Sequence, residues 1–294
     1  MLNSFQKYYD RATATRLLRS GQMPSTLERS FRYLAQLPVT FSEQEKTSFA
    51  AIEKRREGMF NSDEGPVDIF YSPKPSSDDD ADRPQPGKVL QFDIAKIARH
   101  TSVSPYWGRF LHILAADVGA RRILELGSCA GMSACYLATA KSCVALDTIE
   151  ASVPLTALAA ANLAATAPAG RVHNGLFDDV LDTLLPAMGD ERFDLVWIDG
   201  HHEQKATLHY FERLQPYLAE GAIVLFDDIS WSSDMRECWD RLSVMPGFSH
   251  TFDLKTLKGL GIWRGGDIVP QHRFVAKPFG SIRIGDPAGW NEID

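Results

Sequence analysis

The sequence of 294 residues has no long apolar run, no excess of basic residues and only four cysteines. No stretch approaches the roughly 20 apolar residues that span a bilayer, and the first residues contain no signal-peptide core. The formal net charge of −7 argues against general nucleic-acid binding, which needs a basic face to displace counterions. The cysteines have no paired spacing typical of a metal site. We therefore expect a cytoplasmic protein with reduced thiols, no membrane segment and no nucleic-acid partner.

Hydrophobic residues make up 44% of the chain, which is enough for one large α/β domain with an extension. From residue 122 onward, short apolar runs alternate with helical patterns, as a parallel sheet with helical crossovers requires. The expected strands are residues 123–126, 143–149, 172–174, 193–198, 222–226 and a final antiparallel pair, 250–254 and 260–264. The expected helices among them are residues 104–118, 132–140, 154–167, 204–218 and 235–242.

The composition changes along the chain predict three regions. Residues 1–100 form an N-terminal helical extension that includes an acidic, proline-rich loop at 72–88. Residues 101–264 form the α/β domain, and the tail at 265–294 has no clear period. We expect the N-terminal helices to be an accessory layer or a dimer element.

Residues 123–137 form the stretch around which the rest is organised. The apolar strand there contains one acid, Glu125, and ends at Gly127, and a helix begins after Gly131. A strand, a tight glycine turn and a helix start make a nucleotide-binding corner, where the backbone can approach a ligand closely. Because a buried carboxylate is costly to desolvate, Glu125 suggests a ligand group to hold. The alternative is an ordinary strand–turn–helix corner whose glycine serves only its backbone conformation.

The glycine spacing narrows the choice of ligand. The turn lacks the third glycine of the dinucleotide fingerprint, and the chain has no Gly-Lys-Ser/Thr phosphate loop. The pattern Glu-x-Gly-x-x-x-Gly at 125–131 resembles the first motif of class I S-adenosylmethionine-dependent methyltransferases, and residues 125–133 resemble their catechol O-methyltransferase-like branch. The resemblance implies S-adenosyl-L-methionine as cofactor. It also implies an α/β, Rossmann-like doubly wound seven-stranded sheet, mostly parallel with an antiparallel final strand.

Four of the first five expected strands end in acid, at Glu125, Glu150, Asp199 and the pair Asp227 and Asp228. Ligands bind outside the carboxyl ends of the strands in an open parallel sheet, so we expect these acids to converge on one crevice. Each acid taken singly could instead serve a helix cap or a turn.

The second of these acids is a candidate for the ribose. An acid about 20 residues after the glycine turn can accept hydrogen bonds from both ribose hydroxyls. Glu150 follows Gly127 by 23 positions and stands where the second apolar run stops, whereas Asp147 interrupts that run. We prefer Glu150 to Asp147, and the family resemblance also places the ribose acid at the end of this strand.

The resemblance implies further cofactor contacts. Glu125 and Ser133 would hold the ends of the methionine moiety, and Phe177 would lie against the adenine. Asp178 or Asp179 would take the exocyclic amine, although a helix N-cap fits either aspartate equally well. The predicted cofactor-binding residues are Glu125, Gly127, Ser128, Gly131, Ser133, Glu150, Phe177 and Asp199.

Residues 193–202 and 223–231 resemble the two segments of cation-dependent O-methyltransferases that bind a divalent ion. The resemblance implies that Asp199, Asp227 and Asp228 bind Mg²⁺ or another divalent cation, since such ions prefer oxygen ligands. Asp228 stands where the family commonly has asparagine, so the third carboxylate either tightens a metal site or marks a branch that uses none. Without a metal, Asp199 would contact the cofactor, Asp227 would pack against backbone N–H groups, and Asp228 would cap the next helix.

His202 lies three residues after Asp199, where the catechol enzyme carries a lysine that takes the acceptor's proton. A histidine can do this near neutral pH, so we predict His202 as the general base and Asp199 as the second catalytic residue. His201 is the competing base, and His202 could instead cap the following helix or pack under a loop. Trp231 could wall the acceptor site or belong to the core.

These features predict an S-adenosylmethionine-dependent methyltransferase that transfers a methyl group to the hydroxyl of a small molecule. The chain could instead be an N-methyltransferase without metal, or a non-catalytic adenosylmethionine-binding or scaffold subunit. The expected partners are a small-molecule acceptor and a second copy of the chain, bound through the N-terminal helices.

Overall fold

The computed structural model describes residues 4–21, 23–62, 65–71, 88–167, 169–254, 258–268, 270, 272–277, 280–286 and 289–293. Two compact units interleave along the chain: the first comprises Met1–Val39, Phe193–Ile198 and His202–Asp294, and the second comprises Thr40–Arg192 and Asp199–His201. The predicted division after residues 100 and 264 stays a prediction. The predicted acidic loop at 72–88 lies outside the described residues as far as residue 87.

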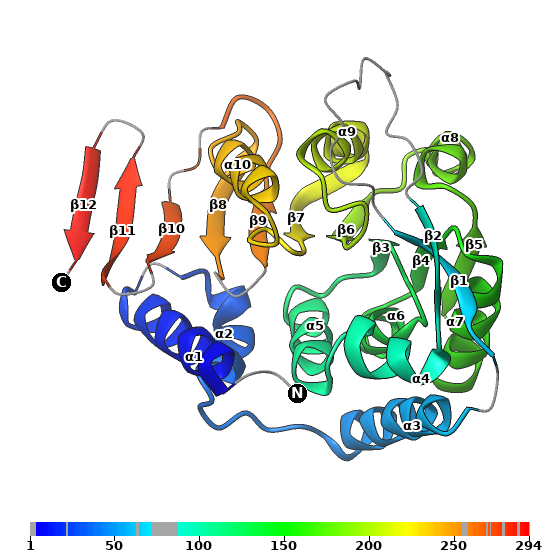
Figure 1. Ribbon diagram of the computed structural model, residues 1–294. Coiled ribbons are helices and arrows are strands. Elements are labelled where there is room, and N and C mark those ends of the chain that lie inside the picture. The colour runs from blue at the N-terminus through cyan, green and yellow to red at the C-terminus, as the bar shows by residue number, and fades with distance from the viewer. Residues whose placement is uncertain are drawn as a thin grey trace. The chain divides into compact units, whose positions relative to one another are not determined.

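The second unit is built on three parallel strands (Figure 1), β3 (Arg122–Leu126), β4 (Ala145–Glu150) and β5 (Gly170–Asn174). Helices α6 (Met132–Ala138) and α7 (Val153–Thr166) connect them, α5 (Pro105–Asp117) precedes β3, and α8 (Phe177–Ala187) follows β5. Helix α5 begins as the sequence indicates, because the Ser104 side chain accepts a hydrogen bond from the Trp107 amide and proline occupies the first helical position. A strand–helix–strand alternation of this kind brings the carboxyl ends of β3, β4 and β5 to one edge.

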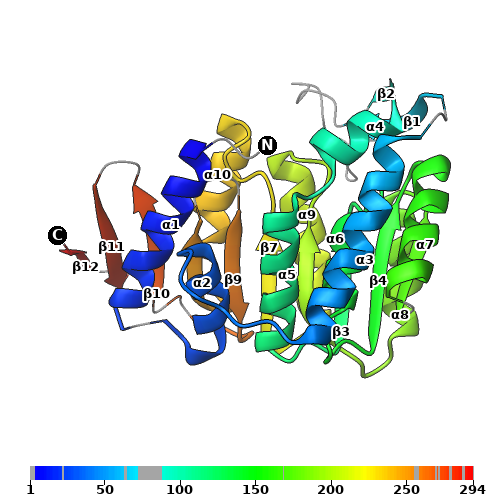
Figure 2. The ribbon, with the colours of Figure 1, turned by 90° about the horizontal axis from the view of Figure 1, so that it is seen from below.

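Helix α3 (Glu43–Phe60) packs against α6 and α7 in the second unit (Figure 2). A capping box between Ser42 and Glu45 starts it, with each side chain accepting a hydrogen bond from the other residue's backbone amide. Arg56 is 4% exposed and donates a hydrogen bond to the carbonyl oxygen of Ala98. This helix is therefore tied into the core of its unit by buried polar contacts as well as by apolar ones.

Short elements complete the second unit. An antiparallel hairpin consists of β1 (Val67–Tyr71) and β2 (Lys88–Phe92), and it is followed by the helical segments α4 (Ile94–Lys96) and η2 (Ile97–Thr101).

The first unit contains β6 (Phe193–Ile198), β7 (Leu218–Phe226), β8 (Phe248–Asp253) and β9 (Gly259–Trp263), paired in the order β6-β7-β9-β8. Strands β6 and β7 are parallel, and β9 runs antiparallel to both of its neighbours. The three strands of the second unit and these four make the seven predicted strands. The second unit's strands are parallel to one another, and within the first unit's four β9 alone is reversed. The predicted Rossmann-like class with an antiparallel final strand is confirmed.

The tail extends the sheet of the first unit. Strand β10 (His272–Lys277) pairs in parallel with β8, and β11 (Gly280–Asp286) and β12 (Gly289–Ile293) follow in antiparallel order. Proline and glycine occur throughout this tail and no clear period runs along it, so sequence analysis does not predict these strands.

Helices cover both faces of the first unit's sheet. In Figure 1, α10 (Ser233–Leu242) lies above β8 and β9, and α1 (Ser4–Arg19) and α2 (Glu28–Leu34) lie below β8 to β10. The contacts agree, because the Phe31 ring of α2 is 5.3 Å from the Phe252 ring of β8, and Trp239 of α10 packs against Gly259. The remaining helices are η1 (Ser25–Leu27), α9 (Gln204–Leu214) and η3 (Gln215–Tyr217). Within the described part of the chain, none of the helices is long and apolar enough to cross a membrane.

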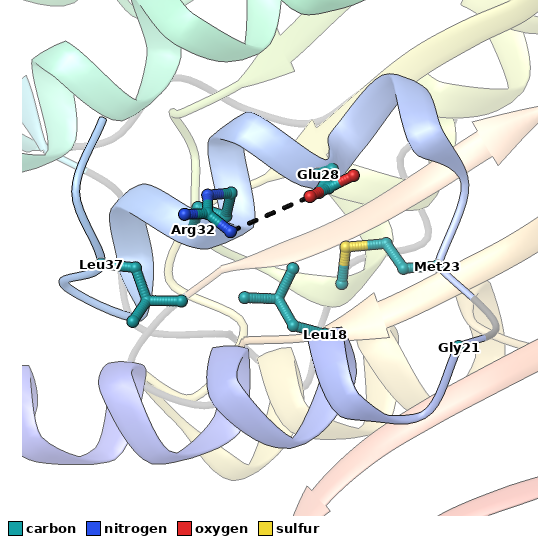
Figure 3. A pocket seen from close by; sticks show the side chains of 6 residues that line it. All are labelled: Leu18, Gly21, Met23, Glu28, Arg32 and Leu37. Atoms are coloured by element: carbon teal, nitrogen blue, oxygen red, sulfur yellow. Dashed lines mark ion pairs between the residues drawn. The ribbon is translucent and has the colours of Figure 1, made fainter. Parts of the chain in front are cut away.

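A pocket of about 330 Å³ opens between α1 and α2 in the first unit. Figure 3 shows the apolar side chains of Leu18, Met23 and Leu37 around it, with Arg32 and Glu28 paired at 4.0 Å. None of the predicted site residues lines this pocket, so it is not the site that the strand-end acids predict.

Candidate active site

Gly127 turns the chain immediately after β3, and it does so at a close backbone crossing. Its φ is +99°, a left-handed conformation that side-chain-bearing residues rarely adopt. Its amide donates a hydrogen bond to the Ile149 carbonyl oxygen at 3.1 Å, and a Cβ here would overlap the carbonyl oxygen of Asp199. Gly131 also has a left-handed φ, +77°, and its Cβ would lie 2.9 Å from the Cα of Ala159. Each glycine is required by a different close approach.

Glu125 is fully buried on β3, and one of its carboxylate oxygens is unsatisfied. Oε2 accepts a hydrogen bond from the Thr148 hydroxyl at 2.5 Å, and the Ser133 side chain also bonds to the carboxylate. Oε1 is buried without a hydrogen-bond partner. Burial raises the pKa of Glu125 to about 7, against the lowering effect of Ser133 and Thr148. A buried acceptor without a donor costs about 1–3 kcal/mol, so this atom is suited to a ligand that donates a hydrogen bond.

Glu150 is fixed at the end of β4 by backbone amides. Its Oε2 accepts from the Cys129 amide and its Oε1 from the Ser152 amide, both at 2.9 Å. Burial raises the pKa of Glu150, and these amide hydrogen bonds oppose the rise. Asp147 instead bonds to His173 Nε2 at 2.8 Å within the sheet. Because each oxygen of Glu150 keeps a second lone pair, Glu150 can still accept hydrogen bonds from a ligand.

Two further predicted residues lie in the same unit. Phe177 is the first residue of α8, and its ring packs so closely on Gly200 that a Cβ there would lie 2.7 Å from Cζ. Ser128 is 2% exposed, and its hydroxyl oxygen has no hydrogen-bond partner. The N-cap of α8 is Leu176, so the interpretation of Asp178 or Asp179 as that cap is wrong.

The second unit therefore brings together all the predicted cofactor-binding residues. Glu125, Gly127 and Ser128 lie at the end of β3, Gly131 and Ser133 at the start of α6, and Glu150 at the end of β4. Asp199 packs through its backbone against Gly127, and Phe177 packs against the residue after Asp199. Two buried oxygens without partners, on Glu125 and Ser128, lie beside a turn that needs glycine. This cluster fits a small ligand that donates hydrogen bonds, such as one carrying an ammonium group.

In the first unit, Asp227 stands at the end of β7 and is already neutralised. Its amide donates to the Ile198 carbonyl oxygen at 2.9 Å, and its Oδ1 accepts from the Asp228 amide at 2.8 Å. The same oxygen forms an ion pair with Nζ of Lys258, whose side chain is 5% exposed. The expectation that Asp227 packs against a backbone N–H group is confirmed, but sequence analysis missed Lys258. Lys258 meets Asp227 only through the antiparallel register of β7 and β9, which places Phe226 opposite Gly259, so no local sequence pattern marks it.

Asp228 adopts a left-handed backbone, with φ of +52°. Burial raises the pKa of Asp228, as does Asp227, whereas His202 and Lys258 lower it. His202 Nε2 lies 3.7 Å from Asp228 Oδ2, a distance that favours charge attraction over a direct hydrogen bond. The next helix is capped by Ser232, so the interpretation of Asp228 as its cap is wrong.

The positions of His202 and Trp231 exclude one structural role for each. The N-cap of α9 is Glu203, so His202 is not the cap of that helix. Trp231 is 61% exposed, so it does not belong to the core.

The sequence suggests Asp199, Asp227 and Asp228 as ligands of a divalent ion, but the geometry of these residues does not fit such a site. Among the side chains that the structure describes, no three or more histidine, cysteine, aspartate or glutamate residues are grouped so that they could hold a metal. Asp227, the central predicted ligand, has its charge balanced by Lys258. Metal binding by Asp199, Asp227 and Asp228 therefore stays a prediction that the geometry does not favour.

Known proteins resemble the part of the chain that carries these residues. Residues 124–229 match a family described as a methyltransferase domain. A catechol O-methyltransferase of Mycobacterium tuberculosis is 30% identical over 164 residues, which are 55% of this chain and 71% of that protein. A catechol O-methyltransferase of Niastella koreensis is 30% identical over 131 residues, 44% of this chain and 58% of that protein.

Solved structures show the same fold. Cofactor-bound Rv0187 from MTB matches with a TM-score of 0.50 and 21% identity, over 83% of this chain and 100% of that chain. The SAH-bound Podospora anserina methyltransferase PaMTH1 matches with a TM-score of 0.50 and 14% identity, over 78% of this chain and 99% of that chain.

The fold and these matches define a class I methyltransferase that uses S-adenosyl-L-methionine. Because the M. tuberculosis relative is matched over 71% of its length, the chain belongs to the catechol O-methyltransferase-like family of S-adenosylmethionine-dependent O-methyltransferases. The predicted enzyme class and cofactor are confirmed.

Proposed function

We propose that this methyltransferase acts on a hydroxyl group of a small molecule, with an aromatic vicinal diol as the first acceptor to test. The names of the two bacterial relatives support that choice of acceptor. In the chain itself, the proposal rests on Glu125, whose buried Oε1 atom lacks a hydrogen-bond donor. The ammonium group at the methionine end of the cofactor is the donor that would satisfy it.

The other residues of the second unit take the remaining parts of the cofactor. Ser128 and Ser133, both nearly buried, hold the methionine carboxylate. Glu150, fixed by two backbone amides, would accept hydrogen bonds from the ribose hydroxyls, and Phe177 would lie against the adenine. Gly127 and Gly131 keep the turn in the left-handed conformation that these contacts need.

His202 is the residue that removes the acceptor's proton. When bound, S-adenosylmethionine would supply a methyl group on a sulfonium sulfur, for transfer to the acceptor oxygen as the carbon–sulfur bond breaks. His202 would take up the proton that the acceptor loses when its oxygen–carbon bond forms. Asp228, whose Oδ2 lies 3.7 Å from His202 Nε2, stabilises the charge that the imidazole gains. Asp199 stays the second predicted catalytic residue.

The base is tested by His202→Ala beside His201→Ala. If His202 is the base, its variant should lose about 10²–10⁴-fold in kcat, while the dissociation constant for S-adenosylhomocysteine stays nearly unchanged. The wild-type rate should fall as the pH is lowered and the base takes up a proton, and His201→Ala should keep that profile. Full activity of His202→Ala with loss in His201→Ala would transfer the role to His201.

The acceptor class is tested with matched aromatic compounds. We would measure transfer of a labelled methyl group to catechol, phenol, ortho-aminophenol and aniline, and locate the methyl group in each product. Methylation on oxygen, fastest with the vicinal diol, is expected. Methylation on nitrogen alone would establish an N-methyltransferase instead. Tight S-adenosylhomocysteine binding without any product would favour the non-catalytic subunit.

A homodimer formed through the N-terminal helices also remains a proposal. The buried side chains of this region, Leu27, Phe31 and Leu34, already pack within the first unit. A dimer would therefore use side chains on the outer faces of the N-terminal helices. Sedimentation velocity over a range of protein concentrations would test it.

A further inference from the structure

Lys258 is a buried cation that no part of the proposed reaction uses. Its side chain is 5% exposed, and its Nζ forms an ion pair with Asp227 Oδ1. Nζ also lies 4.8 Å from the centre of the Trp197 ring, where the negative face of the indole attracts a cation. The Asp227 carboxylate and the Trp197 ring replace the water that a buried ammonium group loses.

The backbone fixes where this cation stands. Strands β7 and β9 pair so that Phe226 lies opposite Gly259, which puts the next residue of β7, Asp227, opposite the preceding residue of β9, Lys258. The carbonyl oxygen of Lys258 accepts a hydrogen bond from the Leu254 amide at 2.9 Å. On the other side, the ring of Trp239 fills the space beside Gly259. The position of Lys258 therefore follows from strand register, and its side chain is not free to swing away.

A divalent ion at the strand-end acids would have to compete with this lysine. Asp227 is the acid at the centre of the predicted triad, and its Oδ1 is already shared by Lys258 and the Asp228 amide. An ion bound there would leave the Lys258 ammonium group buried beside a second positive charge, and like charges at short range repel strongly in a low dielectric. One cation can occupy this position at a time.

We infer that Lys258 stands in the place of a divalent ion beside Asp227, so that this chain keeps its strand-end acids neutralised without a metal. Lys258 is a positioning residue: it holds the carboxylate of Asp227, whose Oδ1 in turn accepts from the amide of Asp228. Asp228 is the residue beside His202, so Lys258 acts on the base through two residues. This inference extends the proposed function, but it concerns cation binding and holds whatever the acceptor is.

Manganese binding tests the inference without any need for an acceptor. The full chain, stripped with chelator and loaded with S-adenosylhomocysteine, is titrated with Mn²⁺ while the free ion is followed by electron paramagnetic resonance. Wild-type protein should bind no Mn²⁺ with a Kd below about 1 mM. Lys258→Met keeps the length of the side chain but removes its charge. It should gain one Mn²⁺ site per chain, held by Asp227 and Asp228 and otherwise by water, since such ions are often bound through only one or two carboxylates. Lys258→Arg should restore the metal-free state.

Controls separate this effect from a change in net charge. Lys141 is exposed, so Lys141→Met loses the same charge and should bind no Mn²⁺. The double variant Lys258→Met/Asp227→Asn should lose the site that Lys258→Met gains. Wild-type binding of one Mn²⁺ that disappears in Asp227→Asn would overturn the inference, as would a folded Lys258→Met that binds none. If Lys258→Met does not fold, the Mn²⁺ titrations of the wild type and Asp227→Asn still show whether Asp227 binds a metal beside Lys258. Binding of S-adenosylhomocysteine shows that each protein tested is native.

Discussion

Two carboxylates near strand ends, one in each unit, differ in whether their oxygens have partners. Glu125 of the second unit has an oxygen with no hydrogen-bond partner and a pKa raised by burial to about 7. Asp227 of the first unit has its charge matched by Lys258 and its Oδ1 occupied by a backbone amide as well. An unsatisfied buried acid indicates where a ligand belongs, whereas a satisfied one indicates a part of the scaffold. Whether a buried acid has partners is a better guide to function than its presence, because the sequence places Glu125 and Asp227 at comparable positions near a strand end.

The largest effect is expected from a side chain placed at Gly127, in the turn next to Glu125. Gly127→Val should abolish S-adenosylhomocysteine binding, because the new side chain would overlap the Asp199 carbonyl oxygen and valine is strained at a φ of +99°. Isothermal titration calorimetry provides the measurement. Gly189→Val is the matched control, since Gly189 has a φ of +56° but open space around it, and it should cost stability without affecting binding. Equal loss in both variants would mean that backbone strain alone is responsible.

The ion pair of Lys258 and Asp227 should show energetic coupling in a double-mutant cycle. Lys258→Met should lower the free energy of unfolding by about 3–5 kcal/mol, because it leaves Asp227, whose side chain is only 11% exposed, without its partner. Adding Asp227→Asn should recover much of that loss. The exposed pair of Lys46 and Glu43 is the control, and Lys46→Met should cost less than about 1 kcal/mol in the same urea titrations. If the double variant is no more stable than Lys258→Met, the two residues are not coupled and the contrast with Glu125 fails.

A smaller effect is expected from the titration of Glu125, which makes the free energy of unfolding depend on pH. The folded-state pKa of Glu125, about 7, lies above the ordinary glutamate value of 4.5, so the folded protein holds a proton that the unfolded chain releases. The free energy of unfolding without cofactor should therefore fall as the pH rises, by about 2 kcal/mol between pH 5.5 and pH 8 from this group alone. Glu125→Gln should lose this dependence, whereas Glu57→Gln, an exposed change in the same unit, should keep it. An identical pH dependence in the wild type and Glu125→Gln would show that Glu125 titrates in its ordinary range.

The sequence was sufficient where function depends on a local pattern. The glycine turn, the acids at the strand ends and the alternation of strands and helices are each carried by a few neighbouring residues, so the fold and the cofactor could be predicted. Lys258 could not be found this way, because its partner lies 31 positions away and meets it only through the register of two antiparallel strands. The same reason applies to the distance between His202 and Asp228, which belong to loops after different strands. The strands of the tail escaped prediction because they are short and separated by glycine and proline, so no long period marks them.

The left-handed backbone of Asp228 also limits how this position can evolve. Its φ of +52° is readily adopted by glycine, asparagine and aspartate, and it is unfavourable for most other residues. Asparagine and the aspartate found here are thus two of the few side chains that the loop admits. An exchange between them would add or remove a charge beside His202 without refolding the loop. The position is constrained in backbone shape and open in charge.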